Sequence, residues 1–432
     1  EKEAIRRYDK ETPITTNMMG TFKGLDYFKW AKEMDVISWD NYPAYNTPWS
    51  MVAMKHDLMR GLKDAPFMLM EQTPSQQNWQ PYNSLKRPGQ MRAQSYQTMA
   101  HGADTIQFFQ LRRSVGGCEK FHGAVIAHAG TEDTRVFREV KQLGEELEQL
   151  SDIIPGSVNE AEVGVIFDWD NYWALEYTSG PSISLKYVDQ IHRYYQYFYE
   201  KNIGTSMIPV DADFSRYKMV VAPVLYMVKP GMKEALEEYV KNGGILVTTY
   251  MSGIVGESDN VYLGGYPGPK EMAGVWVEEI DALAPEQHNV VTFKDGSQSK
   301  CKIVCDLMHL EGAETLGEYA EDFYAGMPAV TRHNYGKGKL YYIGTCMEED
   351  GIAKILSMAA EDAGANPVAG NGNGLEIVKR NGEGNSFYFV MNFKDEALEI
   401  PEEFTGKADL LSGNTVEKGE KLPKFGVKIV VE

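Results

Sequence analysis

Short apolar runs alternate with longer amphipathic stretches through the first 150 residues of the chain. Runs of this kind predict strands, and stretches in which apolar residues recur every three or four positions predict helices. A regular strand-then-helix alternation is typical of a parallel sheet whose strands are joined by crossover helices. The predicted strands are residues 14–19, 35–39, 67–70 and 105–111, and the predicted helices are residues 25–34, 50–62, 89–102 and 134–150.

This region holds four strand–helix units, whereas a closed barrel of eight units takes about 250 residues. It is therefore either half of a barrel or a complete small open sheet. The chain opens with the helix-like segment EKEAIRRYDK, which is neither a signal peptide nor an initiator Met. A start inside a helix favours half of a (β/α)8 barrel, and we expect an N-terminal portion to be missing.

A second α/β region follows a Pro-Gly boundary near residues 153–157. The order of its elements resembles flavodoxin-like or glutamine-amidotransferase-like architectures. Its predicted strands are residues 162–167, 219–222, 245–250, 329–335 and 339–344, its predicted helices are residues 185–201, 233–241 and 351–362, and residues 262–269 are a predicted loop.

From about residue 375 the pattern changes to short strands joined by Gly, Asn and Pro turns, which predicts a small antiparallel β-sandwich. The predicted strands here are residues 375–379, 386–393, 398–400, 408–411 and 427–431. We therefore expect three domains: an α/β half-barrel at residues 1–155, an α/β domain at 156–368, and a small β domain at 369–432.

Composition limits the classes of partner and the cellular compartment that we expect for this chain. The chain has 43 Lys and Arg against 62 Asp and Glu, a net charge of −19, which argues against nucleic acid and anionic membranes as partners. No apolar run approaches the roughly 20 residues of a membrane span. Four cysteines are too few for a disulfide scaffold and are typical of a reducing compartment, so we expect a cytoplasmic protein.

The segment PFMLMEQTPSQQNW carries the sharpest chemical signal, because Glu71 directly follows a continuous apolar strand. A carboxylate at the carboxyl end of a parallel strand is well placed to attack an anomeric carbon in glycoside hydrolysis. Trp79 follows eight residues later, far enough for a loop to fold it over a sugar ring. The alternative is that Glu71 caps the next helix and Trp79 is a core residue, and spacing alone leaves both open.

Two further segments hold candidate site residues after predicted strands. In CEKFH, Glu119 and His122 pair a carboxylate with an imidazole, which suits recognition of hydroxyl groups, although a solvated surface loop fits the same residues. In WDNYP, Tyr42 is able to hydrogen-bond a nucleophile or a sugar hydroxyl, and a simple turn is an equally good interpretation.

Taken together, the segments TNMMG, VISWDNYP, PFMLMEQTPSQQNW, GADTIQFFQLRR and EKFHG resemble the second half of the barrel of glycoside hydrolase family 42 β-galactosidases. The domain order matches as well: barrel, flavodoxin-like trimerisation domain, small β domain. The resemblance implies a retaining β-galactosidase that releases terminal galactose from galactosides, without a cofactor, and forms a homotrimer when intact.

The resemblance also implies roles for individual residues. Glu71 matches the catalytic nucleophile of the family, and Trp79 matches the Trp that closes over galactose. Glu119 and His122 match the pair that binds galactose hydroxyls, and Tyr42 matches a Tyr after the sixth barrel strand.

One part of the family pattern is absent from this sequence. The general acid/base of the family is the Glu of an Asn-Glu pair after the fourth strand, and the chain's only Asn-Glu, at positions 159 and 160, follows the last barrel helix. We therefore expect this chain alone to have little or no activity and the intact protein to be a β-galactosidase. The alternative is a non-catalytic carbohydrate-binding or assembly fragment.

The second α/β region is predicted to be non-catalytic. The strand predicted to end at Tyr250 is not followed by a Cys, and Cys346 precedes acidic residues that disfavour a thiolate nucleophile. Cys301 and Cys305 lack a second ligand pair, so structural thiols are predicted in place of a metal site. Three aromatic residues after the first strand of this region are expected to be exposed and to form an interface or a site wall: Trp169, Tyr172 and Trp173.

Overall fold

The computed structural model of the chain describes residues 1–264, 270–370 and 373–432, and it separates into two compact units. Unit 1 comprises residues 1–160, 199–204 and 367–432, and unit 2 comprises residues 161–198 and 205–366. The predicted loop at 262–269 and the predicted third domain at 369–432 extend partly outside the described residues. Within the described ranges, no helix is long and apolar enough to cross a membrane.

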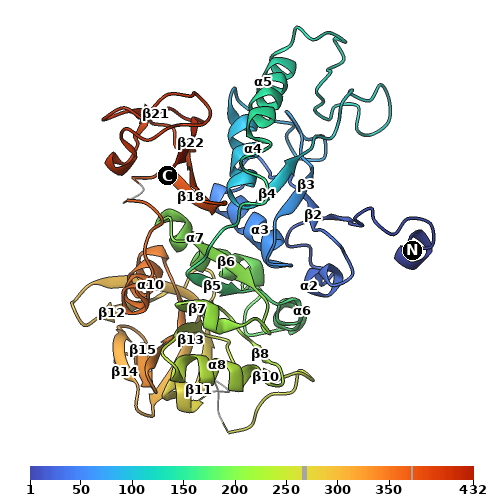
Figure 1. Cartoon of the computed structure of the whole chain (residues 1–432). Helices are drawn as coiled ribbons and strands as arrows, with labels where there is room; N and C mark the ends of the chain where they lie inside the picture. Colours follow the sequence, from blue (N-terminus) through green and yellow to red (C-terminus); the bar gives the residue numbers. More distant parts are fainter. Residues whose placement is uncertain (265–269, 371–372) are drawn as a thin grey trace. The chain divides into compact units, whose positions relative to one another are not determined.

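Unit 1 contains a four-stranded parallel sheet whose strands lie side by side in chain order (Figure 1). The strands are β1 (Asn17–Met18), β2 (Ser38–Asp40), β3 (Phe67–Glu71) and β4 (Ala103–Ile106). All four predicted strands are confirmed in place. The fourth starts two residues earlier than predicted and ends at Ile106, so residues 107–111 are already part of the connection that leaves the sheet.

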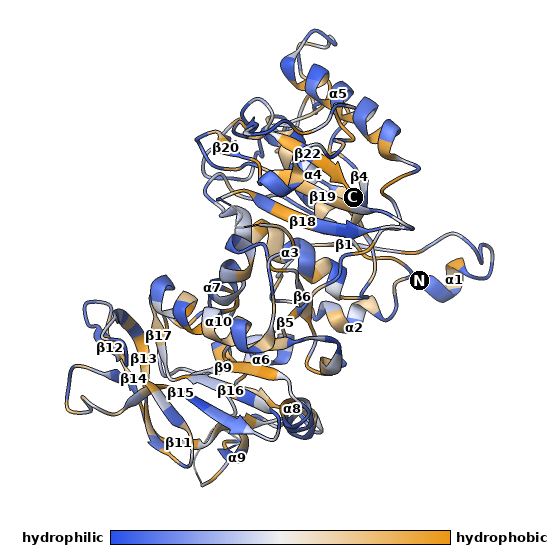
Figure 2. Cartoon of the chain, turned by 60° about the vertical axis from the view of Figure 1, so that its left-hand side comes forward, coloured by the Kyte–Doolittle hydropathy of each residue, from blue (hydrophilic) through white to orange (hydrophobic). Residues whose placement is uncertain are grey.

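The helices of this sheet also occur where the amphipathic pattern predicts them. Side-chain caps fix two of their starts: Asp26 accepts a hydrogen bond from the backbone N–H of Lys29, and Thr134 accepts one from Phe137. Figure 2 shows α5 with hydrophilic and hydrophobic segments alternating along the helix, as expected of a surface helix. The helices are α1 (Lys2–Ile5), α2 (Tyr27–Ala31), α3 (Trp49–Gly61), α4 (Gln90–Ala100) and α5 (Arg135–Leu150).

The C-terminal part of unit 1 is a small antiparallel domain. Its three-stranded sheet packs on α4 through a shared apolar cluster that includes Met91, Tyr96, Phe389 and Ile429. The strand predicted at 408–411 forms only isolated bridges, since this segment makes two single pairings and no continuous ladder. The strands are β18 (Glu376–Asn381), β19 (Ser386–Met391) and β22 (Val427–Val431), with a separate pair β20 (Leu398–Glu399) and β21 (Lys421–Leu422).

A buried ionic network also joins this small domain to the helices of the parallel sheet. The imidazole of His101 lies between two carboxylates, with Nδ1 2.8 Å from Asp57 Oδ1 and Nε2 2.9 Å from Glu376 Oε1. Arg60 donates to Asp57 at 2.6 Å, and Tyr199 donates to Glu376 at 2.8 Å. Burial lowers the pKa of His101, but the two carboxylates outweigh it and raise the pKa to about 9.

Unit 2 is a mixed α/β unit built on one 11-stranded sheet. Its parallel part runs in the spatial order β6-β5-β7-β9-β16, in which β5, β7, β9 and β16 confirm predicted strands and β6 was not predicted. The parallel strands are β5 (Val163–Ile166), β6 (Thr205–Ile208), β7 (Met219–Ala222), β9 (Ile245–Thr249) and β16 (Gly338–Ile343). Helices predicted in this unit are observed as α7 (Tyr187–Glu200), α8 (Met232–Lys241) and α10 (Glu349–Ala363).

The other half of the sheet is antiparallel and was only partly predicted. The hairpin of β15 and β16 across the turn after Tyr335 is confirmed, whereas β11, β12 and β14 were not predicted. Cys301 and Cys305 are both buried in β13, where Ile303 between them has a positive φ of 70° and interrupts the register. The strands are β11 (Val275–Ala282), β12 (Asn289–Phe293), β13 (Gln298–Leu310), β14 (Glu314–Tyr319), β15 (Pro328–Tyr335) and β17 (Thr345–Met347).

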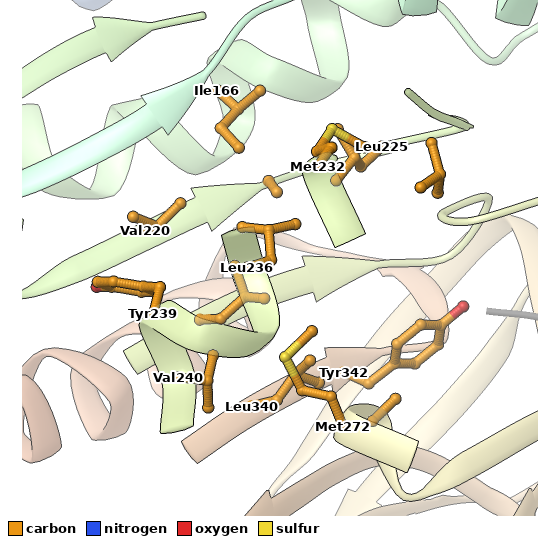
Figure 3. Packing of buried hydrophobic residues seen from close by; sticks show 14 of the residues in the cluster. Ile166, Val220, Leu225, Met232, Leu236, Tyr239, Val240, Met272, Leu340 and Tyr342 are labelled. Atoms are coloured by element: carbon orange, nitrogen blue, oxygen red, sulfur yellow. The ribbon is translucent and has the colours of Figure 1, made fainter. Parts of the chain in front are cut away.

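The core of unit 2 forms where α8 covers the parallel strands. Figure 3 shows Leu236 and Val240 of this helix beside Val220 and Leu340 of the sheet, and all four side chains are buried. The remaining elements of the unit are α6 (Trp169–Tyr177), α9 (Lys270–Ala273), the short pair β8 (Met227–Val228) and β10 (Val255–Gly256), and a 3₁₀ turn at Phe214–Arg216.

Trp169 corrects one prediction. The sequence suggested an exposed aromatic, but the side chain is fully buried and contacts Phe167 edge to face at 4.7 Å between ring centroids. The reason is that α6 starts directly at Trp169, with Asp168 as its N-cap, so the first side chain of the helix turns into the core. Tyr172 and Trp173 on the same helix are half-buried.

Candidate active site

Glu71 lies at the carboxyl end of β3, where the strand register sets its neighbours. Its Cα pairs with that of Asp40 on β2, and its backbone carbonyl accepts a hydrogen bond from Asn41 N–H at 2.8 Å. The Glu71 side chain is half-buried, and it is not the cap of a helix, because α4 begins at Gln90 with Gly89 as its N-cap. The cap interpretation of Glu71 is therefore wrong.

Two side chains hold the Glu71 carboxylate in place. Asn17, at the end of β1, donates from Nδ2 to Oε1 at 3.1 Å, and the hydroxyl of Tyr42 donates to Oε2 at 2.9 Å. Each carboxylate oxygen thus receives one hydrogen bond from a neutral donor. This arrangement fixes the orientation of the carboxylate and leaves its negative charge without a cationic partner among the residues that the structure describes.

Asp40 is a second carboxyl group beside Glu71. The amide of Asn17 lies 3.0 and 3.3 Å from the two oxygens of Asp40, so one side chain bridges both acids. Burial and the negative charge of Glu71 raise the pKa of Asp40 to about 7, against the lowering effect of the Asn17 hydrogen bond. Near neutral pH the pair therefore carries less than its full negative charge.

The aromatic residues predicted for the site form one group around Tyr42. Its ring lies 4.9 Å from that of Trp79 and 5.8 Å from that of His122, edge to face in both cases, and the Trp79 and His122 rings stack at 4.9 Å. Trp79 is half exposed and His122 is buried. Burial lowers the pKa of His122, so the imidazole is neutral at pH 7.

Asn78 orients the His122 ring. Its Nδ2 donates to the carbonyl of Cys118 at 2.7 Å, which leaves Oδ1 to accept from Nδ1 of His122 at 3.1 Å. The same loop places Glu119, whose carbonyl accepts the backbone N–H of His122 at 2.9 Å. The negative charge of Glu119 raises the pKa of both His122 and Tyr42. Burial has the larger effect on each, and it lowers the pKa of His122 and raises that of Tyr42.

The structure therefore brings all five predicted residues into one neighbourhood, and it adds three that the sequence analysis gave no role: Asn17, Asp40 and Asn78. The first two are the polar residues at the ends of β1 and β2, the position that already pointed to Glu71 on β3. Asn78 directly precedes Trp79. Their roles depend on contacts between strands and loops that a linear pattern does not specify.

The chemistry of this group is that of a carboxylate beside aromatic and hydroxyl-binding side chains. A half-exposed indole offers a face for the C–H groups of a sugar, and the carboxylate next to it is able to attack an anomeric carbon. Within the described residues, no group of three or more His, Cys, Asp or Glu side chains is arranged to hold a metal ion.

Three domain families match consecutive parts of the chain and together span nearly all of it. They are described as "Beta-galactosidase" (residues 1–150), "Beta-galactosidase trimerisation domain" (161–366) and "Beta-galactosidase C-terminal domain" (374–432). The order of the three matches the order of the regions distinguished from the sequence.

Individual proteins are similar over the same extent. The chain is 51% identical to the β-galactosidase BgaP of Planococcus sp. (strain L4) over its whole length, and 51% identical to LacZ of Lactobacillus acidophilus over 98% of it. The crystal structure of a β-galactosidase from Bacillus circulans sp. alkalophilus covers the whole chain with a TM-score of 0.97 and 50% identity.

The chain spans 65% of the length of the Planococcus protein, 63% of LacZ and 65% of the Bacillus circulans chain. Gan42B, a GH42 β-galactosidase from G. stearothermophilus, gives the same picture, with a TM-score of 0.93 and 39% identity over 99% of this chain and 65% of its own. On these grounds the chain belongs to the glycoside hydrolase family 42 β-galactosidases.

Proposed function

We propose that this chain carries the nucleophile side of the active site of a retaining β-galactosidase, with Glu71 as the nucleophile. The observation that supports the proposal best is the setting of the Glu71 carboxylate, which is held by Asn17 and Tyr42 and lies beside the Trp79 ring that Tyr42 contacts. In the reaction, one Glu71 oxygen forms a bond to the anomeric carbon as the aglycone oxygen leaves. Water then cleaves the galactosyl–enzyme ester.

The neighbouring residues receive roles that fit their positions. Trp79 packs on the galactose ring, and neutral His122 and Glu119 both accept hydrogen bonds from galactose hydroxyls. The Oδ1 atom of Asn78 accepts the hydrogen bond from Nδ1 of His122. The other ring nitrogen, Nε2, is then the acceptor that we expect to face the ligand. Tyr42 and Asn17 are positioning residues that act through Glu71.

The finer architecture also belongs to this proposal. The chain order of β1 to β4 fits the second half of a (β/α)8 barrel, because consecutive parallel neighbours are what such a barrel contains. The order β6-β5-β7-β9-β16 is the 2-1-3-4-5 order of flavodoxin-like sheets. We assign residues 1–155 to the catalytic domain, 156–368 to a trimerisation domain and 369–432 to a small β domain, in a cytoplasmic homotrimer of the intact protein.

A retaining glycosidase also requires a general acid/base about 5–5.5 Å from the nucleophile. The family places it in an Asn-Glu pair for which this sequence offers no match ahead of Glu71. Because general acid catalysis contributes about 10²–10⁴-fold, we expect this chain alone to bind galactosides and to turn over ordinary ones poorly. The intact protein is expected to hydrolyse them.

A mechanism-based label separates the nucleophile from the acid. A 2,4-dinitrophenyl 2-deoxy-2-fluoro-β-galactoside has a leaving group that needs no protonation, and its fluorine slows hydrolysis of the glycosyl–enzyme ester. Incubated with this chain alone, it is expected to attach one fluorogalactosyl group, which peptide mass spectrometry should locate on Glu71. The Glu71→Gln variant and the corresponding fluoroglucoside serve as controls. Labelling of another residue, or none at all in a folded chain, would refute the assignment.

The second experiment tests activity in the complete enzyme. The chain is joined to the N-terminal segment of the Planococcus relative that it does not match, and both forms are assayed with an aryl β-galactoside. The joined protein is expected to exceed the chain alone by at least about 10²-fold. Equal turnover by the two forms would show that this chain already contains its acid/base.

A further inference from the structure

A groove in unit 1 is lined by parts of the same loops that carry the candidate site residues. It is a groove of about 450 Å³, formed by the loops after β2 and β3, the start of α4 and the small β domain. We call it the Tyr45–Tyr82 groove after the two aromatic residues on its walls. Its lining includes none of the residues assigned above to galactose: Glu71, Tyr42, Trp79, Glu119 and His122.

The walls of the groove are aromatic and open to solvent. Tyr45 and Tyr82 are 62% and 68% exposed, and their rings meet edge to face at 6.1 Å although they come from different loops. Deeper in the groove, Trp49 stacks on Phe393 of the small β domain at 4.4 Å. Rigid aromatic faces of this kind pack against the C–H faces of sugars at a low cost in side-chain entropy.

Two side-chain amide oxygens at the floor of the groove have no hydrogen-bond donor as a partner within the described ranges. Gln77 and Gln94 line it and are 7% and 3% exposed, and the Oε1 atom of each lacks a hydrogen-bond partner among the residues that the structure describes. The Gln77 amide is oriented, because its Nε2 donates to the carbonyl of Pro43. Buried acceptors normally have a partner, and these two oxygens have almost no accessible surface, so a ligand hydroxyl reaches them only if the Gln77 or Gln94 side chain shifts toward the groove.

The groove carries a small net positive charge. Lys86 is buried with its Nζ 2.6 Å from the Thr73 carbonyl, and burial lowers its pKa to about 7, so about half of it is uncharged at neutral pH. Lys424 forms an ion pair with Asp395, and Arg87 lies on the exposed rim. The aromatic walls and the side-chain amides of the lining favour a polyhydroxylated ligand, and Arg87 on the rim is the main charge that the Lys424–Asp395 pair and the partly neutral Lys86 leave.

We propose that the Tyr45–Tyr82 groove is a second carbohydrate site that binds a neutral oligosaccharide. The groove and the galactose site share loops, since Pro43 follows Tyr42 and Gln77 lies two residues before Trp79. The ligand class follows from the lining alone, and the inference rests on the proposed function only in the choice of a galactosyl probe.

Binding of β-1,4-galactotetraose to the Glu71→Gln chain, measured by isothermal titration calorimetry and saturation-transfer NMR, tests the proposal. The added Tyr45→Ala and Tyr82→Ala changes are expected to weaken binding about tenfold, the loss typical of one good aromatic contact. Tyr8, 94% exposed and outside the groove, supplies the matched control Tyr8→Ala, which should bind as the parent does. Gln94→Leu removes one orphaned acceptor, and circular dichroism checks its fold.

A Trp79→Ala change in the same background separates the groove from the galactose site. The groove proposal expects this variant to retain binding of the tetraose, with the saturation transfer still dependent on Tyr82. Loss of all binding on Trp79→Ala, unchanged binding in the Tyr45→Ala/Tyr82→Ala chain, or displacement of the tetraose by inorganic phosphate would overturn it. Failure of fluorogalactosyl labelling at Glu71 would refute the proposed function and leave the groove result standing.

Discussion

Both units contain an acidic residue at or just after the carboxyl end of a parallel strand, and the two carboxylates have different partners. Asp168, after β5, is 6% exposed; it caps α6 through Asn171 and pairs with Lys229 at 2.6 Å. Within the described part of the chain, the Glu71 carboxylate at the end of β3 receives hydrogen bonds only from the neutral donors Asn17 and Tyr42. Position at a strand end is therefore not sufficient for a catalytic carboxylate. What distinguishes Glu71 is that, among the described residues, its carboxylate neither caps a helix nor forms an ion pair.

The largest expected effect comes from exchanging these two acids for neutral residues. In the joined protein, Glu71→Gln is expected to lower kcat/KM by at least about 10³-fold, because the nucleophile is lost. Its melting temperature should stay close to that of the parent.

The paired variant Asp168→Ala is expected to show the reverse. It leaves Lys229 with only part of its ion pair and α6 without its cap, at a cost of about 3 kcal/mol in unfolding free energy. Turnover per folded molecule should persist. A large loss of turnover in folded Asp168→Ala, or of stability in Glu71→Gln, would remove the distinction.

His101 extends the comparison to a carboxylate pair that binds a cation. Its pKa is about 9 in the folded chain against the usual 6.5, so the imidazolium stabilises the fold fully below pH 6.5. This contribution, of about 3 kcal/mol, should disappear as the pH rises from 6.5 through 9.

Urea unfolding across this pH range measures the effect. The His101→Gln variant should lack the decline between pH 6.5 and 9, whereas replacement of exposed His128 by Gln should preserve it. A decline of equal size in the His101→Gln variant would show that other groups produce it.

Tyr42 tests how much the two hydrogen bonds contribute to the setting of Glu71. Tyr42→Phe removes one donor and keeps the ring next to Trp79, so kcat of the joined protein should fall about 10- to 100-fold with little change in stability. The pH profile of kcat should shift as well, which a purely structural role would not cause. Tyr8→Phe is the control.

Asp40 gives the smallest expected effect. Because its pKa is raised to about 7, its favourable contribution to folding is present below pH 3.8 and is lost as the pH rises through 7. Asp40→Asn should therefore raise the melting temperature more at pH 8 than at pH 5. Asp133→Asn, at an 87% exposed carboxylate, should change it equally at both values.

The strands β1 to β4 and the helices between them were predictable because each follows from a local apolar pattern. The same holds for the β15–β16 hairpin, which Gly336 and Gly338 mark. The antiparallel strands β11 and β14 escaped prediction, and register shifts interrupt the ladders that hold them. β12 was missed as well, although it pairs with β13 in a regular hairpin.

The candidate site divides in the same way. Glu71 and Trp79 were identified from one segment, and the resemblance of that segment to a known family supplied their expected roles. The bridging of Asp40 and Glu71 by Asn17 required the register of three strands, and the orientation of His122 by Asn78 required two loops to meet. Trp169 was misjudged because a helix start decides the direction of its side chain.

The two donors to Glu71 come from the ends of β1 and from the loop after β2, both earlier in the same segment. Glu71 and the two side chains that donate hydrogen bonds to its carboxylate therefore form one block within this chain. Chimaeras that combine this block with the leading segments of different relatives would keep one attacking group constant. Any difference in product pattern among these chimaeras would then be attributable to the leading segment taken from the relative.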